Sequence, residues 1–432
     1  MQGLDEYIKH AADPHSAANR IESLLNFTEF KRCASQLPGE QLNALINLIS
    51  HSGLFYRHIC RHPDSIEKLN HPLNLTESSL KYDFNSLEDL KIFKYQQLLN
   101  ITWLDFLGTY EYEKILNDIS SLADLVINQV IRLGLPDAHT QIVKKHMAAF
   151  GMGKLGASEL NFSSDIDLIF VCSNTADVKL EIYHYQKILQ DSIRLISSHL
   201  EKKTSEGFFY RVDLKLRPWG RSGPLVMTIN ETENYYEASS QIWERFAWLR
   251  ARHIMGPKIL ADDLQNRLKS FIYRRSLGED DLQRFVEIKT EMCAARRKKG
   301  YWDVKVGEGG IRDIEFFIQM LQMVNAYKFP ELQQPATIKV LNGLKQNELI
   351  SEHEAAELLH SYLFLRKLEN RLQMIEEHQT HELPDEYPKR IMIARSMGIT
   401  GDSDNEIIDV FESELFTNQM IAKNFFERIL PN

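Results

Sequence analysis

Hydrophobic residues in the first 130 positions recur at intervals of three and four, the spacing typical of helices with one apolar face. The clearest stripes are Leu42, Leu45, Ile46 and Ile49, and then Ile119, Leu122, Val126 and Val130. The segments HPDS at 62–65 and HPLN at 71–74 interrupt this pattern. We therefore expect a helical region over residues 1–130, without chemistry of its own.

The pattern changes after RLGLPDAHT at 132–140, where glycine and proline predict the end of a helix. HMAAFGMG at 146–153 fits either a helix end or a buried strand. The β-branched and aromatic run IDLIFVC at 166–172 predicts a strand. An amphipathic helix should follow, because apolar residues again recur at helical spacing. They are Leu189, Ile193, Ile196 and Leu200.

Two further strands are expected, one in FFYRVDLKLRP at 208–218 and one in PLVMT at 224–228. Mixed strands with crossing helices indicate a small mixed-sheet core of the α+β class. We place this catalytic core at residues 131–255.

The chain should turn helical again after Thr228. Asn230 and Glu233 have the spacing of a capping box ahead of one long helix carrying YYEASSQIWERFAWLRAR. A later seam, spaced by three and four, predicts helices packed in a bundle over residues 256–432. Its members are Leu365, Leu368, Leu372 and Ile375. The predicted fold is thus α+β, with two helical regions flanking the core and helix predominating overall.

Composition narrows the class of protein. Hydrophobic residues make up 43% and charged residues 26% of the 432 positions, as in folded globular proteins. No stretch approaches 18 uninterrupted apolar residues, and the first residues lack the basic flank and apolar run of a signal peptide. We expect a cytoplasmic protein with no membrane partner. Four scattered cysteines, without a CxxC pair, indicate reduced thiols and no cysteine-based zinc site or disulfide framework. They are Cys33, Cys60, Cys172 and Cys293.

The formal net charge of −9 disfavours a nucleic-acid partner, because such proteins usually carry a basic field. Local basic clusters occur at Arg274 and Arg275 and at 296–299. Runs of this kind are more often solvated helix faces than binding sites.

Candidate chemistry begins with two carboxylates at the start of the expected strand 166–172. Asp165 and Asp167 should project to the same side, about 6 to 7 Å apart along the backbone, while Ile166, Leu168 and Phe170 point into the core. Side-by-side carboxylates repel each other unless a cation lies between them. Mg²⁺, a hard ion that takes oxygen ligands, is the expected occupant.

The expected strand 208–218 repeats this arrangement, with Arg211, Asp213, Lys215 and Arg217 on one face. Asp213 could complete a metal site while the cations bind phosphate oxygens. Alternatively, the strand faces solvent and its charges pair with each other. The nearby acidic pair favours the functional interpretation.

Three glycines, Gly151, Gly153 and Gly156, precede the acids. A glycine turn can bring backbone N–H groups against a phosphate, although many such turns have no ligand. What carries the prediction is the order of the features: a glycine turn, about ten residues, and then Asp-x-Asp opening an apolar strand.

This order resembles the signature of the nucleotidyltransferase superfamily. Gly153 and Lys154 occupy the turn, Asp165 and Asp167 form the pair, and Asp213 is the third acid. Lys154 departs from the serine that is common at its position, so the resemblance implies no hydroxyl contact there.

Longer blocks resemble, in order, the bacterial glutamine synthetase adenylyltransferase family. The blocks are GKLGASELNFSSDIDLIF, VDLKLRPWGRSGPLV, NYYEASSQIWERFAWLRAR, DVKVGEGGIRDIEFFIQ and FLRKLENRLQMIEEHQTHELP, with RHPDSIEKL nearer the start. Family members carry two homologous halves, one removing AMP from a tyrosine of glutamine synthetase and one attaching it. GGIRDIEF and RSGPLV look more like the N-terminal, adenylyl-removing half, so we expect the chain to be that half. Gln241 departs from the arginine expected ahead of WER.

The resemblance implies a Mg²⁺-dependent phosphorolysis of adenylyl-tyrosine that yields ADP. Two Mg²⁺ ions, with Mn²⁺ as an alternative, would be held by the three aspartates. Ser163 and Ser164 would hold phosphate oxygens, together with Gly153 and Lys154, and Lys215 or Arg217 would orient the inorganic phosphate. The implied partners are adenylylated glutamine synthetase and a PII-type signalling protein. Two alternatives stay open: adenylyl transfer from ATP by the same acids, and a non-catalytic domain that binds nucleotide or regulators.

The GGIRDIEF block contributes Arg312, Asp313 and Glu315. Arg312 and Glu315, three residues apart, form either a structural ion pair or a second set of polar contacts to the nucleotide. His378 and His381 are interpreted as satisfied polar groups at a helix end rather than as metal ligands.

Overall fold

The computed structural model describes residues 3–69, 82–175, 178, 181–274, 287, 291, 294, 302–375 and 379–429. Several sequence features lie outside these residues. They are HPLN at 71–74, Arg275, the basic run 296–299, Cys293 and His378. The described cysteines, Cys33, Cys60 and Cys172, are free thiols.

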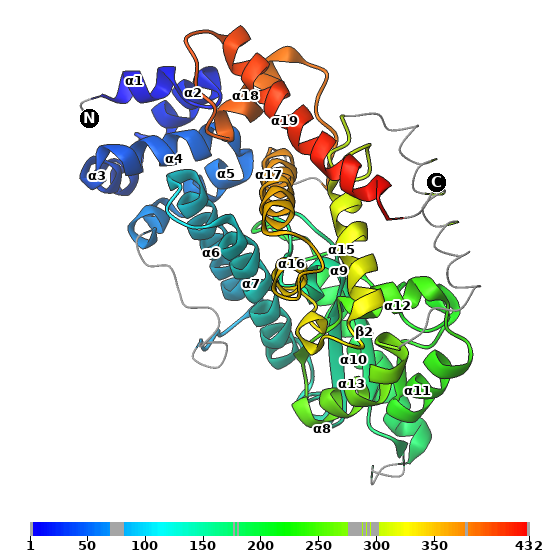
Figure 1. Cartoon of the computed structure of the whole chain (residues 1–432). Helices are drawn as coiled ribbons and strands as arrows, with labels where there is room; N and C mark the ends of the chain where they lie inside the picture. Colours follow the sequence, from blue (N-terminus) through cyan, green and yellow to red (C-terminus); the bar gives the residue numbers. More distant parts are fainter. Residues whose placement is uncertain are drawn as a thin grey trace.

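Helices open the chain, as the spacing of its apolar residues predicts. They are α1 (Leu4–Lys9), α2 (Pro14–Leu24), α3 (Thr28–Gln36), α4 (Gly39–His51), α5 (Gly53–Arg61), the 3-10 helix η1 (Pro63–Lys68), α6 (Leu87–Leu107), α7 (Tyr112–Gly134) and α8 (Asp137–His146). Both expected stripes are confirmed, since their residues are buried in α4 and α7. In Figure 1 these helices occupy the blue and cyan part of the molecule.

The central part of the chain alternates strands and helices. Its elements are β1 (Met147–Met152), α9 (Gly153–Gly156), β2 (Ile166–Cys172), α10 (Ile182–Glu201), β3 (Val212–Asp213), η3 (Gly220–Ser222), β4 (Val226–Thr228), α11 (Ile229–Ala238), α12 (Ile242–Leu249), β5 (Arg252–Met255) and α13 (Lys258–Ile272). The five strands form one mixed sheet in the order β3-β2-β1-β5, with β4 also pairing with β2. β2 runs antiparallel to β1 but parallel to β3 and β4. The expected α+β class is thereby confirmed.

Alternate residues of β2 enter different cores, because successive side chains on a strand point to opposite faces. Ile166, Leu168 and Phe170 face the core shared with the N-terminal helices, as predicted. Ile169 and Val171 enter a second core, which includes residues of α11, α12, α13 and α15 (Ile311–Asn325). Both faces of the sheet are therefore covered.

The C-terminal helices form a third core of their own. After α15 come η4 (Pro330–Leu332), α16 (Thr337–Gln346), α17 (Glu352–Met374), α18 (Tyr387–Ser396) and α19 (Asp404–Glu427). α17 contacts both α7 and α15, and Figure 1 shows it between the N-terminal helices and the rest of the bundle. The predicted leucine seam is confirmed, since Leu365, Leu368 and Leu372 are buried on α17 and Ile375 caps its end.

The helix predicted through residues 235–252 is wrong in two respects. It breaks between α11 and α12, and its last residue, Arg252, begins strand β5 instead. The break is stabilised because Gln241 and Glu244 form a capping box that starts α12. Gln241, the departure from the family blocks, thus has a structural role.

The capping box predicted at Asn230 and Glu233 is also wrong. Thr228 ends β4 and caps α11 directly, together with Glu231. Asn230 and Glu233 instead both accept hydrogen bonds from Arg267 of α13, at 3.1 and 2.8 Å. The helix therefore begins two residues earlier than the pattern predicted.

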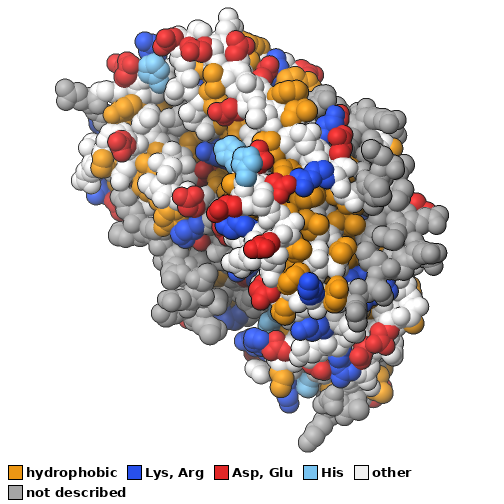
Figure 2. All heavy atoms as spheres, viewed as in Figure 1, with side chains coloured by type: hydrophobic (Ala, Val, Ile, Leu, Met, Phe, Trp, Pro, Cys, Tyr) orange, Lys and Arg blue, Asp and Glu red, His pale blue; other side chains and the backbone are white. Residues whose placement is uncertain are grey.

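Charges are mixed on the surface. On the face shown in Figure 2, acidic and basic side chains lie interspersed rather than gathered by sign. Among the helices that the structure describes, none is both long enough and apolar enough to span a membrane.

Candidate active site

Three carboxylates meet at the end of the sheet where β2 and β3 begin. The two strands pair in parallel, with Ile166 opposite Val212 and Asp167 opposite Asp213. Paired strands lie about 4.8 Å apart, and Asp165 stands immediately before β2. The structure thus brings together the three aspartates singled out from the sequence.

Their charges interact strongly. Burial, together with the negative charges of Asp213 and Asp165, raises the pKa of Asp167 to about 7. Arg211 Nε donates to Asp165 Oδ1 at 2.5 Å, and the Lys215 ammonium pairs with Asp213. Two cations therefore offset part of the negative charge that the site concentrates.

The site fits a hard divalent cation. Carboxylate oxygens from Asp165, Asp167 and Asp213 are the ligands that Mg²⁺ prefers. Burial, and then the charges of Asp213 and Asp165, raise the pKa of Asp167, and a bound cation would oppose this shift. Space beside the acids is kept by Gly153, where a Cβ atom would lie 3.1 Å from Asp167 Oδ2. Gly153 also has a positive φ of 55°, which favours glycine.

The glycine turn connects β1 to β2. Gly151 lies within β1, and Gly153 and Gly156 bound the one-turn helix α9. A Cβ atom on Gly156 would lie 1.8 Å from the carbonyl oxygen of Arg250, so the chain segments approach too closely for any side chain there. This glycine is needed for packing.

The long strand predicted at 208–218 is wrong. Only Val212 and Asp213 pair with β2, and the chain turns from Lys215 onward. Trp219 and Gly220 both adopt positive φ angles, of 57° and 58°, next to Pro218, which has no N–H to donate. The alternation of charged and apolar residues therefore extends to Arg217, although the strand ends at Asp213.

Lys215 and Arg217 consequently share no strand face with Asp213. The backbone N–H of Lys215 donates to Asp213 Oδ1 at 2.7 Å, which keeps this cation beside the acids. The Arg217 guanidinium donates to the carbonyl oxygens of Leu214, Arg221 and Gly223, and so holds the turn together.

Ser163 and Ser164 lie just ahead of the acids. Ser163 is buried, and its hydroxyl accepts a hydrogen bond from Arg211 at 3.4 Å. The Ser164 hydroxyl donates to the carbonyl oxygen of Asp165 at 3.0 Å. Both serines thus border the acidic site.

The loop that carries these serines is anchored by polar residues of α17, which were not recognised from the sequence. Asn370 Oδ1 accepts from the N–H of Phe162, and Gln373 Oε1 from that of Ser163, both at 2.9 Å. Arg366 donates to the carbonyl oxygen of Glu159 and, at 2.5 Å, to Asn161 Oδ1. The sequence did contain a sign of this anchor, because four polar residues recur at helical spacing along α17. They are Arg366, Glu369, Asn370 and Gln373.

Lys154, which follows Gly153 in the glycine turn, also contacts α17. Its Nζ donates to both carboxylate oxygens of Glu369 at 2.8 Å. Burial lowers the pKa of Lys154 to about 7, while Glu369 counteracts this shift. The pair ties the glycine turn to the C-terminal bundle.

Of the two alternatives for Arg312 and Glu315, the ion pair between them is absent from the contacts of the described residues. Glu315 instead pairs with Arg250 at 2.9 Å, and Arg312 is exposed. Arg250 also pairs with Glu159 at 2.9 Å, so α15 and the loop ahead of the acids are joined through one buried guanidinium. Asp313 accepts from the N–H of Gly309 at 2.9 Å and stabilises the start of α15. His381, as predicted, is a satisfied polar group, since it pairs with Asp303 at 3.3 Å.

Comparison with protein families and curated proteins yields consistent matches. Residues 42–266 match the family model of glutamate-ammonia ligase adenylyltransferase, and residues 284–430 match that of GlnD PII-uridylyltransferase. A relative from Thioalkalivibrio sulfidiphilus (strain HL-EbGR7) is 37% identical over 79% of this chain and 36% of its own length. A relative from Shewanella woodyi (strain ATCC 51908 / MS32) is 33% identical over 87% of this chain and 42% of its own length.

Both relatives are named bifunctional glutamine synthetase adenylyltransferase/adenylyl-removing enzyme. The chain thus spans less than half the length of either relative.

Proposed function

Because the chain belongs to the glutamate-ammonia ligase adenylyltransferase family, we propose that it removes AMP from an adenylylated tyrosine of glutamine synthetase. The observation that carries this proposal is the meeting of Asp165, Asp167 and Asp213 at the paired starts of β2 and β3. Three clustered carboxylates are suited to metal-assisted transfer of a nucleotidyl group. The names of the two relatives supply glutamine synthetase as the substrate protein.

The direction of the reaction rests on resemblance to the adenylyl-removing half of the family, in the blocks at 221–226 and 309–316. An oxygen of inorganic phosphate attacks the phosphorus of adenylyl-tyrosine, and the bond from phosphorus to the tyrosine oxygen breaks. The products are ADP and a tyrosinate, which then takes up a proton. Since the pKa of tyrosine is about 10, this leaving group needs little help from a general acid.

The roles of the residues follow from where they lie. Asp165, Asp167 and Asp213 would hold Mg²⁺, with Mn²⁺ as an alternative, and the metal would neutralise charge on the phosphate of the transferred adenylyl group. Lys215, beside Asp213, is placed to attract the incoming phosphate. Ser163 and Ser164, together with Gly153, border the space next to the acids.

Lys154 and Arg217 are better assigned to positioning, because their polar atoms engage Glu369 and three backbone carbonyls respectively. Arg312, Asp313 and Glu315 do not form one polar group facing the acids. Glu315 acts through Arg250 on the loop ahead of the aspartates. A PII-type signalling protein, implied by the resemblance, is proposed as a regulatory partner.

Adenylyl transfer from ATP is the second candidate, because the same carboxylates serve either direction and both relatives carry both activities in their names. One assay separates the two. The protein is incubated with adenylylated glutamine synthetase, Mg²⁺ and phosphate, and ADP and the modified tyrosine are followed. Parallel reactions contain ATP and unmodified synthetase. We expect ADP in the first reaction and no transfer in the second; the opposite result would assign the adding activity instead.

Site variants test the chemistry within that assay. Asp213→Asn keeps the side chain's shape but removes its charge, and we expect it to lose most ADP formation. Asp191→Asn is the matched control, because Asp191 forms an exposed pair with Arg194 on α10. If Asp213→Asn retained full activity while Asp191→Asn behaved like the parent, the carboxylate cluster would not be the metal site.

A further inference from the structure

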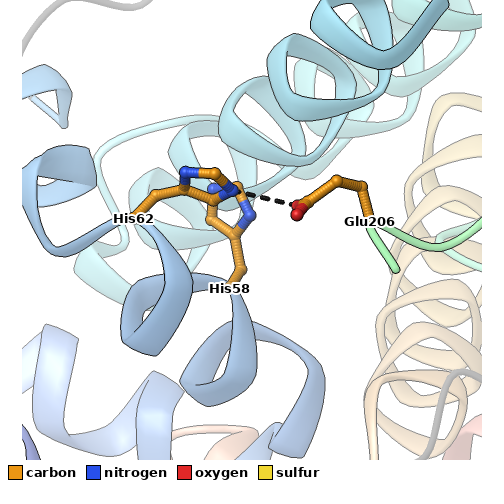
Figure 3. Close-up of side chains that lie close together, drawn as sticks. All are labelled: His58, His62 and Glu206. Carbon is orange, nitrogen blue, oxygen red and sulfur yellow. Dashed lines mark hydrogen bonds and ion pairs between the residues drawn. The ribbon is translucent and has the colours of Figure 1, made fainter. Parts of the chain in front are cut away.

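A second group of possible metal ligands lies apart from the three aspartates. His58 belongs to α5, His62 follows the end of that helix, and Glu206 lies in the turn after α10 (Figure 3). One ligand atom from each of these residues lies within 4.8 Å of the other two. His62 Nε2 and Glu206 Oε2 are 2.9 Å apart, and the rings of His58 and His62 are 5.1 Å apart.

His58 is the least expected member of the group. Its side chain is only 3% exposed, and its Nε2 atom is buried without a hydrogen-bond partner. A buried polar atom left unpaired costs free energy, on the order of 1 to 3 kcal/mol.

The structure holds the three residues in fixed positions. His58 and His62 are four residues apart, which places both rings on one side of the helix end. Glu206 sits in a tight turn closed by two hydrogen bonds between Thr204 and Gly207, of 2.8 and 3.0 Å. Gly207 has a φ of 98°, and a Cβ atom there would lie 2.4 Å from the Tyr95 hydroxyl oxygen, so the turn packs directly against α6.

We propose that His58, His62 and Glu206 bind one divalent transition-metal ion of the Zn²⁺ class. Two imidazoles and one carboxylate are a common zinc ligand set, which leaves a fourth position for water. Metal–ligand bonds of about 2.0 to 2.2 Å would place the ligand atoms roughly 3.3 to 3.5 Å apart in a tetrahedral site. Small side-chain movements from the observed separations are sufficient.

The donor set also selects the metal. Mg²⁺ prefers oxygen ligands in octahedral geometry, whereas imidazole nitrogen suits Zn²⁺, Co²⁺ and similar ions. This site is therefore chemically distinct from the three aspartates. Arg61 and Lys68 act on His58 with positive charge, and Glu206 opposes them. One anionic ligand is thus available to offset the charge of the ion.

Metal binding here would link α5 to the segment that leads into β3. Glu206 precedes Asp213 by seven residues in the chain. The ion would therefore hold the N-terminal helices against the polypeptide that carries one of the three acids. This proposal does not depend on the direction of the adenylyl reaction, because its test measures metal content.

The test uses the whole chain, stripped of metal and then equilibrated with Zn²⁺ in excess Mg²⁺, which occupies the carboxylate site. Bound zinc is measured by elemental analysis after dialysis, and Co²⁺ is used in parallel for its visible spectrum. We expect one zinc per chain, and a Co²⁺ spectrum typical of tetrahedral nitrogen and oxygen ligands.

Three variants locate the ion. Glu206→Gln and His58→Gln should each lose the bound zinc, whereas His353→Gln should retain it. His353 is the matched control, because it pairs with Glu357 four residues away but is 83% exposed. Glu206 is 12% exposed and lies in a turn, so its variant should fold even if the one at buried His58 does not. Circular dichroism checks folding.

Retention of zinc by a folded Glu206→Gln variant, or failure of the parent protein to bind zinc, overturns the proposal. In that case His62 and Glu206 form only an ordinary hydrogen-bonded pair with His58 beside it.

Discussion

Replacing Arg366 by methionine should destabilise the protein and impair the site together. The guanidinium is fully buried and donates to Glu159 and Asn161 in the loop ahead of the acids and, at 2.6 Å, to the Tyr362 hydroxyl. It also lies 3.6 Å from a carboxylate oxygen of Glu369. Methionine fills much of the same volume but leaves these groups without their donor.

The magnitude follows from the buried charges. Breaking a buried ion pair by removing one partner costs about 3 to 5 kcal/mol, because the remaining charge is left uncompensated. The entropy of unfolding is about 2.1 cal/mol/K per residue, or roughly 0.9 kcal/mol/K for a chain of 432 residues. If the chain unfolds in one transition, Tm should fall by roughly 3 to 6 °C.

Activity should fall as well, since the loop that leads to Asp165 loses one of its anchors on α17. A displacement of about 1 Å at a reacting group can cost on the order of 100-fold in rate. The measurements are calorimetry for Tm and ADP formation below the transition for kcat. Arg194→Met is the control, because the Arg194 side chain is 60% exposed and pairs with Asp191 at the surface. Such a pair contributes about 0 to 1 kcal/mol to the free energy of unfolding. An Arg366→Met protein that melts and turns over like this control would refute the reasoning.

Three other changes probe separate parts of the molecule. Burial lowers the pKa of His51 to about 3 in the folded protein, whereas the pKa of an unfolded histidine is about 6.5. The unfolded chain therefore takes up the proton at higher pH than the folded chain, and the stability falls as the pH drops below about 6.5. His51 should contribute about 2 kcal/mol of the stability lost by pH 5, so urea unfolding at pH 7.5 and 5 should show a loss smaller by that amount in His51→Gln than in the parent. Gly156→Ala should prevent folding or lower Tm far more than Gly108→Ala, since nothing lies within 4 Å of a Cβ at Gly108 and only its φ of 65° is unfavourable. EDTA should abolish ADP formation without changing the circular dichroism spectrum, and Mg²⁺ alone should restore it; activity that persists in EDTA would exclude the proposed metal dependence.

Elements with strong local patterns were predictable from the sequence. β2 is rich in β-branched and aromatic residues whose side chains point alternately to the two faces of the sheet, and α7 carries a long apolar stripe. In each case the same residues that define the pattern also fill the core, so local preference and tertiary packing agree. The acids at the start of β2 could be singled out because carboxylates are costly at that position without a cation.

Predictions failed where a pattern of charges did not show which groups those charges contact. The segment 208–218 alternates like a strand, but Arg217 binds three carbonyls of a turn instead of extending the sheet. Glu315 was matched with Arg312 three residues away, yet its partner is Arg250. A pattern shows which residues can share a face, whereas the fold decides which charges meet.

The polar stripe on α17 shows how a local pattern can carry information about a remote site. Its leucines are explained by bundle packing, but Arg366, Glu369, Asn370 and Gln373 are also buried. Buried polar groups need partners, and a helix cannot supply them from its own backbone. Such a stripe therefore predicts a second surface of irregular backbone that needs donors and acceptors. In this chain that surface is the loop 159–163, which leads directly into Asp165, so the C-terminal bundle helps to shape the acidic site from about 200 residues away.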